Sequence, residues 1–265
     1  MSIRDEVLDD QRRTRTVSRD SYLPAKWVYN PGNVHAVTTL RYGGVSTGDY
    51  QGYNLAAHVG DAERSVGANR AKLVADLQLP AEPVWLDQVH SEKVIRVEEK
   101  ADSELIVQAD ASVTSVSGAV CAVLTADCLP VFFCNRAGTE VAVAHAGWRG
   151  LHAGIIANTV NAMRSAASDI LVSLGPAIGA QSFEVGEEVL QAFADKDVSN
   201  SSAFVASRKG HYLCDLYQLA RLELQSLGID KIAGGDFCTY RENHRFYSYR
   251  RQQITGRMAS LIWFQ

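Results

Sequence analysis

Residues 119–144 read AVCAVLTADCLPVFFCNRAGTEVAVA, and this stretch decides the fold class. Apolar runs at 119–124, 131–133 and 141–144 follow one another across short turn segments. Runs of this length, rich in Val and Phe, are typical of buried strands. Since a doubly wound sheet would place a helix between consecutive strands, the stretch predicts an α+β fold.

The rest of the chain adds further strands and several helical patterns. Strands are expected at residues 34–39, 83–86, 93–97, 170–174 and 231–233, and helices at 65–76, 150–164, 186–194 and 213–227. Gly228 follows the last helix, where a left-handed residue commonly ends a helix. No Pro/Ser/Gly linker or fixed-period repeat follows Trp27. We therefore expect one domain over residues 25–265, preceded by a flexible, charged extension over residues 1–24.

Composition and charge exclude several classes of protein. The 265 residues are 46% hydrophobic and 21% charged, which is ordinary globular usage and rules out extensive disorder. The net charge of -4 provides no bulk positive field to attract nucleic acid or an anionic membrane. The longest weakly polar run, residues 118–134, contains Asp127 and Pro130 and is shorter than the roughly 20 apolar residues that a membrane span needs.

The expected location follows from the N-terminus and the cysteines. The first twenty residues contain no apolar segment of the kind that a secretory signal requires. Five cysteines, an odd and modest number, favour reduced thiols over a disulfide framework. These features predict a cytoplasmic protein.

Three cysteines, Cys121, Cys128 and Cys134, lie within the deciding stretch. Their spacings of seven and six residues match no structural zinc pattern. Cys121 and Cys134 lie within apolar strand runs, where cysteine acts as a small buried hydrophobic residue. Cys128 lies between Thr-Ala-Asp and Leu-Pro, in a turn from which a thiol can point into a cleft. A structural turn cysteine is an equally open interpretation at this point.

The segment VAVAHAGWRG at 141–150 places His145 at the end of an apolar strand, before a small-residue turn and the start of a helix. Strand ends present side chains to clefts, and a helix N-terminus offers unpaired N–H groups to an anion. Arg149 would add a fork-shaped donor for phosphate or carboxylate. The alternative, a capped turn with Trp148 in the core and Arg149 in solvent, carries equal weight.

His90 ends the segment WLDQVH at 85–90, where strand alternation breaks. A single histidine is more often structural than a ligand, but His90, Cys128 and His145 together could hold a zinc ion. Two imidazoles and one thiolate leave a fourth position for water or substrate, which is the pattern of a catalytic site. Separations of 38 and 17 residues cannot establish such a site. Cys128 and His145 could instead act as nucleophile and base without a metal.

Two glycine-rich stretches, RYGGVSTG at 41–48 and LGPAIG at 174–179, each follow a strand. Neither contains G-x-G-x-x-G or the Lys-Ser/Thr ending of a P-loop, so nucleotide-motif interpretations fail. Their backbones could approach a ligand closely, although tight turns are the more common explanation.

Eight segments in this order resemble one family over nearly the whole chain from Trp27 onward, the laccase-domain family of purine nucleoside phosphorylases. The family was formerly labelled multicopper polyphenol oxidases and includes bacterial YfiH-type proteins, and the likeness is strongest to its members that edit peptidoglycan precursors. The matching segments are RYGGVS at 41–46, NLAAH at 54–58, WLDQVHS at 85–91, TADCLP at 125–130, HAGWRG at 145–150, LGPAIG at 174–179, FEVG at 183–186, and SYRR at 248–251 with TGR at 255–257.

The resemblance implies a zinc site held by His90, Cys128 and His145, with copper as the alternative metal. It also implies that Arg41 and His58 line the site and act with Cys128 in catalysis. The implied fold is similar to the deamidase domain of cytotoxic necrotizing factor toxins, a single domain with two β-sheets packed between helices (αββα). Those toxins use a Cys/His pair without metal, which keeps a metal-free cysteine hydrolase open as an alternative.

The activity implied first is zinc-dependent phosphorolysis of adenosine, inosine and methylthioadenosine, accompanied by adenosine deaminase activity. Arg41 and Arg149 suit the binding of phosphate, because a guanidinium pairs with two phosphate oxygens at once. His58 suits protonation of the leaving purine, because an ordinary histidine has a pKa of roughly 6.5 and can carry a proton near neutral pH. The expected partner is a small-molecule substrate rather than nucleic acid or a membrane, and the expected state is a monomer.

Two other activities are compatible with the same resemblance. One is amide hydrolysis that removes a wrongly attached L-serine from a UDP-muramoyl precursor of peptidoglycan. The other is copper-dependent phenol oxidation, which is weaker because one His/Cys/His site supplies fewer ligands than a multicopper relay needs. Metal analysis and a substrate panel would separate these alternatives.

Overall fold

The computed structural model describes residues 21–100 and 107–265. The expected N-terminal extension lies outside the described residues as far as residue 20. Tyr22–Pro24 form strand β1, which pairs antiparallel with β2 (Val34–Thr39). Ser21 and Tyr22 are buried. The folded domain therefore includes residues that the sequence assigned to the extension, because these residues pair with a sheet strand.

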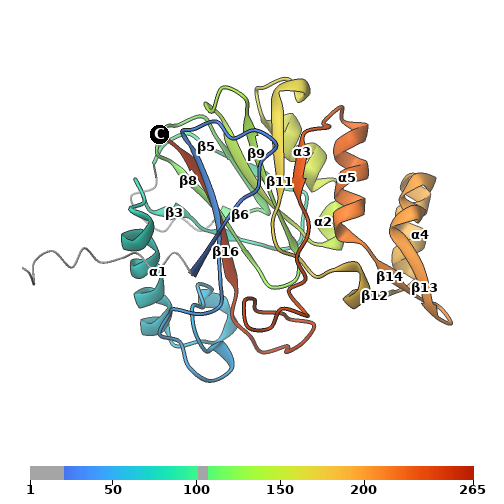
Figure 1. Ribbon diagram of the computed structural model, residues 1–265, viewed down its shortest axis with the longest axis horizontal. Helices are drawn as coiled ribbons and strands as arrows, with labels where there is room; N and C mark the ends of the chain where they lie inside the picture. The colour runs from blue at the N-terminus through green and yellow to red at the C-terminus, as the bar shows by residue number, and fades with distance from the viewer. Residues whose placement is uncertain (1–20, 101–106) are drawn as a thin grey trace, which may run out of the picture.

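Two β-sheets form the centre of the fold (Figure 1). The first has the strand order β1-β2-β16-β8-β3, in which β16 spans Met258–Phe264, β8 Val120–Thr125 and β3 Pro83–Val84. The second has the order β15-β11-β9-β10-β7-β5, and these strands span Ile232–Gly234, Ile170–Leu174, Leu129–Asn135, Val141–Ala146, Ala111–Thr114 and Val94–Val97. The stretch that decides the fold therefore supplies β8 to one sheet, and β9 and β10 to the other.

Three clusters of buried apolar side chains separate four layers, which are a helical layer, the two sheets and a second helical layer. Between the sheets, side chains of β8 pack against those of β9, including Cys121, Val123, Phe132 and Cys134. The alternate residues of β8 face the layer of helix α1 (Glu63–Leu77), because successive strand side chains point to opposite faces. The outer face of the six-stranded sheet packs against α2, α3 and α5, which span Trp148–Ala153, Ile155–Ala162 and Leu216–Ser226. Figure 1 shows α1 on one side of the sheets and these three helices on the other, which confirms the predicted α+β sandwich.

Smaller elements are attached to this sandwich. A three-stranded sheet has the order β12-β14-β13, and its strands span Glu184–Gly186, His211–Cys214 and Phe204–Arg208. With α4 (Glu187–Lys196) it projects beyond α5, at the right of Figure 1. A two-stranded sheet joins β4 (Leu86–Asp87) to β6 (Val107–Gln108).

Several predicted elements differ from the structure in ways that have local causes. The helix expected at 150–164 is divided at Gly154, whose φ of 101° ends α2 and begins α3. The helix expected at 213–227 begins only after Asp215, whose side chain accepts a hydrogen bond from the Gln218 N–H, because the preceding residues belong to β14. Gly228 has the expected left-handed backbone, with φ 80°. The strand expected at 83–86 is two short strands in different sheets, and β16 was not predicted.

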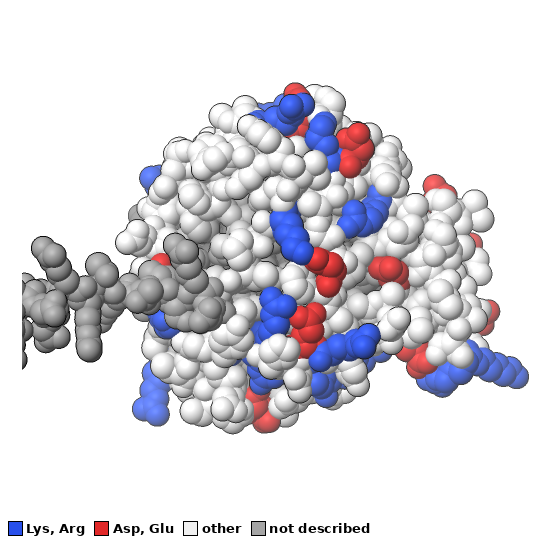
Figure 2. Space-filling view, viewed as in Figure 1, with Lys and Arg blue, Asp and Glu red and all other residues white. Residues whose placement is uncertain are grey.

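The described part of the chain contains no helix that is both long and apolar enough to cross a membrane. On the face shown in Figure 2, basic and acidic side chains lie interspersed among uncharged residues. This distribution agrees with the small net charge of the sequence, -4.

Candidate metal centre

The chain crosses from one sheet to the other where β8 ends and β9 begins. Thr125 ends β8, Leu129 begins β9, and Cys128 lies in the turn between them, as the sequence predicted. His145 of β10 lies opposite Pro130 of β9, which brings its side chain close to this turn. His90 follows β4 and has a left-handed backbone, with φ 61°. Three segments that are distant in the sequence thus meet beside the same turn.

The side chains of His90, Cys128 and His145 form a compact cluster. Their potential ligand atoms lie within 4.8 Å of one another, and Cys128 Sγ lies 3.8 Å from His90 Nε2. Around a tetrahedral zinc ion, bonds of about 2.0–2.3 Å place ligand atoms roughly 3.3–3.8 Å apart. A small contraction would therefore let the cluster hold one ion, and its imidazole and thiolate donors suit zinc or copper. In residues 21–100 and 107–265, no other His, Cys, Asp and Glu group meets this geometry.

Asp110 holds two of these candidate ligands in place. Its carboxylate accepts a hydrogen bond from His145 Nδ1–H at 2.8 Å, so His145 Nε2 faces Cys128. The same carboxylate accepts from the backbone N–H groups of Val89 at 3.2 Å, His90 at 3.0 Å and Ser91 at 2.7 Å. Burial would raise the pKa of Asp110, but its donors lower it to about 2. The ionised carboxylate orients the imidazole of His145, the arrangement that is usual for histidine ligands of metals.

The surroundings of Cys128 favour its thiolate form. Burial would raise the pKa of this thiol, but His145 and His90 together outweigh burial and the pKa falls to about 6. Burial would lower the pKa of His145, whereas Cys128 and Asp110 raise it to about 9. The thiolate is both the metal-binding and the nucleophilic form of cysteine, so this pair suits either chemistry. Cys121 and Cys134 differ, because burial within strands raises the pKa of each thiol to about 12.

The cluster lines a cavity of about 470 Å³, a size that is typical of small-molecule sites. Part of the cavity is apolar or aromatic and is formed by Leu124, Trp148, Ile178, Phe183, Leu216 and Tyr249. Three arginines also line it, and each guanidinium lies over an aromatic ring of the same cavity. The distances to the ring centres are 4.5 Å for Arg149 and Trp148, 5.1 Å for Arg250 and Phe183, and 5.8 Å for Arg257 and Tyr249. Stacking of this kind restrains the orientation of the cations.

Of the three cavity arginines, Arg257 is the one whose side chain is hydrogen-bonded to the backbone of its own loop. Its Nη1 donates to the carbonyl oxygens of Thr255 at 2.8 Å and Gly256 at 3.1 Å. Burial lowers the pKa of Arg257, and the negative charge of the Cys128 thiolate, which lines the same cavity, opposes that effect. Arg257 can therefore present a fixed positive charge beside the metal cluster.

His58 lines the same cavity from a short 3-10 helix at Ala57–Val59. Desolvation and the positive charge of Arg257 lower its pKa below the ordinary 6.5. The imidazole is therefore neutral at neutral pH. A neutral imidazole favours a hydrogen-bonding role for His58 over the role of proton donor that an ordinary histidine pKa suggested.

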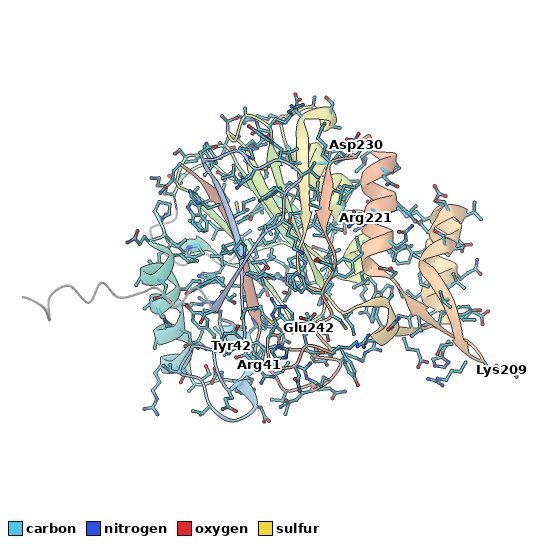
Figure 3. All side chains as sticks on the ribbon, viewed as in Figure 1. Arg41, Tyr42, Lys209, Arg221, Asp230 and Glu242 are labelled. Carbon is cyan, nitrogen blue, oxygen red and sulfur yellow. The ribbon has the colours of Figure 1, made fainter. Side chains whose placement is uncertain are left out.

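Arg41 lies in a separate, open depression, which is formed largely by the glycine-rich residues 42–48 with Asn243 and His244. Its Nη1 donates to the carbonyl oxygen of Asn243 at 3.0 Å, and its guanidinium lies 5.0 Å from the centre of the Tyr247 ring. Figure 3 shows Arg41 beside Tyr42 in this loop. Arg41 is not among the residues that line the cavity of the metal cluster.

The structure thus brings most of the expected site residues into one cavity, namely His58, His90, Cys128, His145 and Arg149. Arg250 and Arg257 also belong to it, although the sequence analysis gave them no role. Both stand in segments that carried the family resemblance, SYRR at 248–251 and TGR at 255–257. Their place in these segments is the sequence signal that could have identified them as site residues.

Comparison with known proteins identifies the family. The profile of a family described as multi-copper polyphenol oxidoreductase laccase matches residues 35–265. The chain belongs to this laccase family. The match confirms the resemblance that the eight sequence segments indicated.

Relatives within the laccase family are similar over almost their whole length. The Escherichia coli K12 protein named purine nucleoside phosphorylase YfiH is 52% identical over 233 residues, 88% of this chain and 95% of the relative. A Haemophilus influenzae protein named purine nucleoside phosphorylase is 46% identical over 237 residues, 89% of this chain and 96% of its own.

Solved structures of similar proteins show the same fold. A Neisseria meningitidis protein superposes with a TM-score of 0.87 at 46% identity, covering 92% of this chain and 99% of its own. YlmD from Geobacillus stearothermophilus superposes with a TM-score of 0.84 at 28% identity, covering 91% of this chain and 100% of its own.

Proposed function

We propose that this protein is a zinc-dependent purine nucleoside phosphorylase. The observation that carries the proposal is one shared cavity, lined by the His/Cys/His cluster, three ring-stacked arginines and His58. The relatives from Escherichia coli and Haemophilus influenzae are named purine nucleoside phosphorylase. The proposed substrates are phosphate with adenosine, inosine or methylthioadenosine, and the products are the free base and the sugar 1-phosphate.

Phosphorolysis requires a phosphate that is fixed beside C1′ of the sugar. A guanidinium suits this task because it is permanently charged and pairs with two phosphate oxygens. Arg257 meets the requirement through the hydrogen bonds that hold it in the cavity that Cys128 lines, and Arg250 and Arg149 line the same cavity. We therefore assign the phosphate to these three arginines, rather than to Arg41 as the sequence suggested.

The purine and the sugar need a wall that holds a flat ring and excludes water. Tyr249, Phe183 and Trp148 offer aromatic faces, and Ile178 and Leu216 add apolar surface. Aromatic rings favour offset or edge contacts with a planar base. His58, neutral at neutral pH, can donate or accept one hydrogen bond at the base as the glycosidic bond breaks.

The residues His90, Cys128 and His145 would hold the zinc, with Asp110 fixing the imidazole of His145. When bound, zinc supplies a Lewis acid that lowers the pKa of a water molecule, which is the chemistry that the accompanying adenosine deaminase activity needs. The chain contributes the thiolate of Cys128 and the orientation of both imidazoles.

A second candidate function is removal of L-serine from a UDP-muramoyl precursor by amide hydrolysis. One observation favours it: residues 241–257 contain five arginines and one acidic residue, Glu242. Arg250 and Arg257 of this segment line the cavity, and such an excess of positive charge suits a diphosphate.

A metal analysis and a substrate panel test the proposal together. We expect one zinc ion per chain, and phosphate-dependent release of free base from inosine and adenosine, with some ammonia from adenosine. Release of free serine from UDP-muramoyl-L-serine, without phosphorolysis, would favour the second candidate. Several copper ions would favour phenol oxidation, and turnover by metal-free protein would favour a cysteine hydrolase.

We also propose that the protein acts as a monomer in the cytoplasm. All five cysteines are free, as in a reducing compartment. Light scattering after size exclusion would test the monomer, and cell fractionation would test the location.

A further inference from the structure

Asp127, the residue before Cys128, combines a strained backbone with a buried side chain. Its φ is 98°, a left-handed conformation that normally favours glycine. The side chain is nevertheless buried rather than solvated. A glycine would satisfy the turn more easily, so the carboxylate itself must account for an aspartate at this position.

The carboxylate of Asp127 accepts three hydrogen bonds from the C-terminal loop. Its Oδ1 accepts from Thr239 Oγ1 at 2.5 Å. Its Oδ2 accepts from Ser248 Oγ at 3.0 Å and from the backbone N–H of Arg250 at 2.7 Å. The carbonyl oxygen of Asp127 accepts a fourth hydrogen bond, from the Ile178 N–H at 2.9 Å. One residue therefore ties the Cys128 turn to two separate segments of the chain.

Those two segments contribute to the wall of the cavity that the His/Cys/His cluster also lines. Ile178, Tyr249 and Arg250 all line the cavity. The Arg250 guanidinium lies over Phe183 and donates to the carbonyl oxygen of Glu184 at 2.8 Å. Arg250 is therefore held twice, by its side chain at Glu184 and by its backbone N–H at Asp127.

We propose that Asp127 is a positioning residue that fixes the Cys128 thiol at a set distance from the cavity wall carrying Tyr249 and Arg250. Through Asp127, the candidate metal ligand Cys128 and Arg250, a cation suited to anionic ligands, stay in a fixed position relative to one another. The assignment concerns the geometry of the cavity; the binding readouts below use the zinc and phosphate of the proposed function, and only the turnover readout depends on its reaction.

Two substitutions separate the backbone of Asp127 from its carboxylate. Asp127→Gly relieves the left-handed backbone but removes all three side-chain acceptors. Asp127→Asn keeps an acceptor for Ser248 and Arg250, while its NH₂ group can face Thr239, whose hydroxyl can turn to accept. Gln78→Gly is a matched control, because Gln78 is also left-handed, with φ 47°, but follows helix α1 and lies outside the cavity.

Binding measurements on the full chain test the proposal without any turnover. Zinc affinity is measured by chelator competition, and inorganic phosphate affinity by calorimetry on the zinc-loaded protein. We expect Asp127→Gly to lose about tenfold or more in both affinities, since hydrogen bonds to a charged group are among the stronger ones. Asp127→Asn should stay within about threefold of the wild type, and Gln78→Gly should be unchanged in both.

Two results would overturn the proposal. Wild-type affinities in Asp127→Gly would show that the turn needs only its backbone. Affinities in Asp127→Asn as low as those in Asp127→Gly would show that the negative charge acts, rather than the geometry. If Asp127→Gly does not fold, Thr239→Val and Ser248→Ala each remove one hydrogen bond to the Asp127 carboxylate, and Ser248→Ala also removes the acceptor of the Arg251 N–H. Each variant should weaken phosphate binding about threefold or more, and no change in either variant would also overturn the proposal.

Turnover is measured separately with inosine and phosphate. If the wild type binds zinc and phosphate but releases no base, the proposed function fails while the binding series still decides the role of Asp127. If the wild type turns inosine over, a positioning role predicts that Asp127→Gly raises the KM for phosphate and that Asp127→Asn restores it.

Discussion

His145 Nδ1 lies 2.8 Å from Asp110 Oδ1, and both side chains are buried. Asp110 also accepts hydrogen bonds from the N–H groups of residues 89–91, which carry His90. A residue that is not itself a candidate ligand therefore orients two of the three that are. Metal affinity in this protein should depend on that carboxylate as well as on the ligands.

Asp110→Asn should lower zinc affinity by about 10- to 100-fold, which is the usual cost of removing a group that orients a metal ligand. The amide would present an N–H group to at least one donor of the 89–91 turn or of His145. Chelator competition measures the effect, with Asp230→Asn as a control because that side chain is 86% exposed. Zinc affinity within about threefold of the wild type would contradict the role of Asp110.

The three cysteines near the turn should separate into one ligand and two core residues. Cys128→Ser should lose zinc and activity, because a serine hydroxyl does not replace a thiolate. Cys121→Ser and Cys134→Ser should keep zinc but lower the free energy of unfolding by about 1–3 kcal/mol, since each buries a hydroxyl in an apolar layer. Metal analysis and thermal denaturation distinguish the two effects, and full zinc content in Cys128→Ser would be inconsistent with the cluster.

Zinc binding should itself stabilise the protein. A ligand that binds only the folded state at about 100 times its dissociation constant contributes about 2.7 kcal/mol. Chelation should therefore lower the Tm of the wild type and leave the Tm of Cys128→Ser unchanged. Scanning calorimetry with and without added zinc checks this, and equal zinc responses in both proteins would argue for a metal site elsewhere.

Much of the fold follows from local sequence, but strands β7 and β16 of the two central sheets do not. The runs 119–124, 131–133 and 141–144 were identifiable as strands because burial on both faces produces continuous apolar sequence. Strand β16, Met258–Phe264, is equally buried, but a short apolar run alone does not distinguish a strand from a helix. Its partners β2 and β8 are distant in the sequence, so only the folded chain shows the pairing.

The candidate site was predictable where chemistry coincided with a break in a strand pattern. His90, Cys128 and His145 each stand at such a break, and they do meet. Asp110 gave no comparable signal, because it acts largely through backbone N–H groups that sequence does not reveal. The glycine-rich loop after Arg41 indicated an approachable backbone but not which depression that backbone borders.

The phosphate assignment can be tested by comparing two arginines. Arg257→Lys should raise the KM for phosphate by about tenfold or more, because lysine cannot copy the two-pronged guanidinium contact, which contributes about 1.5–3 kcal/mol. Zinc content should not change. Arg41→Lys is the matched variant in the neighbouring depression and should alter that KM by less than about threefold. A larger effect in Arg41→Lys would move the phosphate to the glycine-rich loop.

Glu140 provides a pH-dependent contribution to stability far from the cavity. Its side chain is buried and accepts hydrogen bonds from the Arg164 N–H at 2.9 Å and from the Ser165 hydroxyl at 2.8 Å. The carboxylate also pairs with Arg96 Nη2 at 3.2 Å. Burial would raise the pKa of Glu140, but these donors lower it below the ordinary 4.5.

Because the pKa of Glu140 is lower in the folded than in the unfolded chain, its ionised form adds stability that is complete above the ordinary 4.5. That stability is lost as the pH falls through the lowered folded value. Glu140→Gln should therefore reduce the free energy of unfolding by about 2–3 kcal/mol at pH 7, and the difference from wild type should shrink below about pH 4.5. Urea denaturation across this range measures it, with Glu98→Gln as a control because that side chain is 70% exposed. A difference that did not change with pH would mean that Glu140 acts through packing rather than charge.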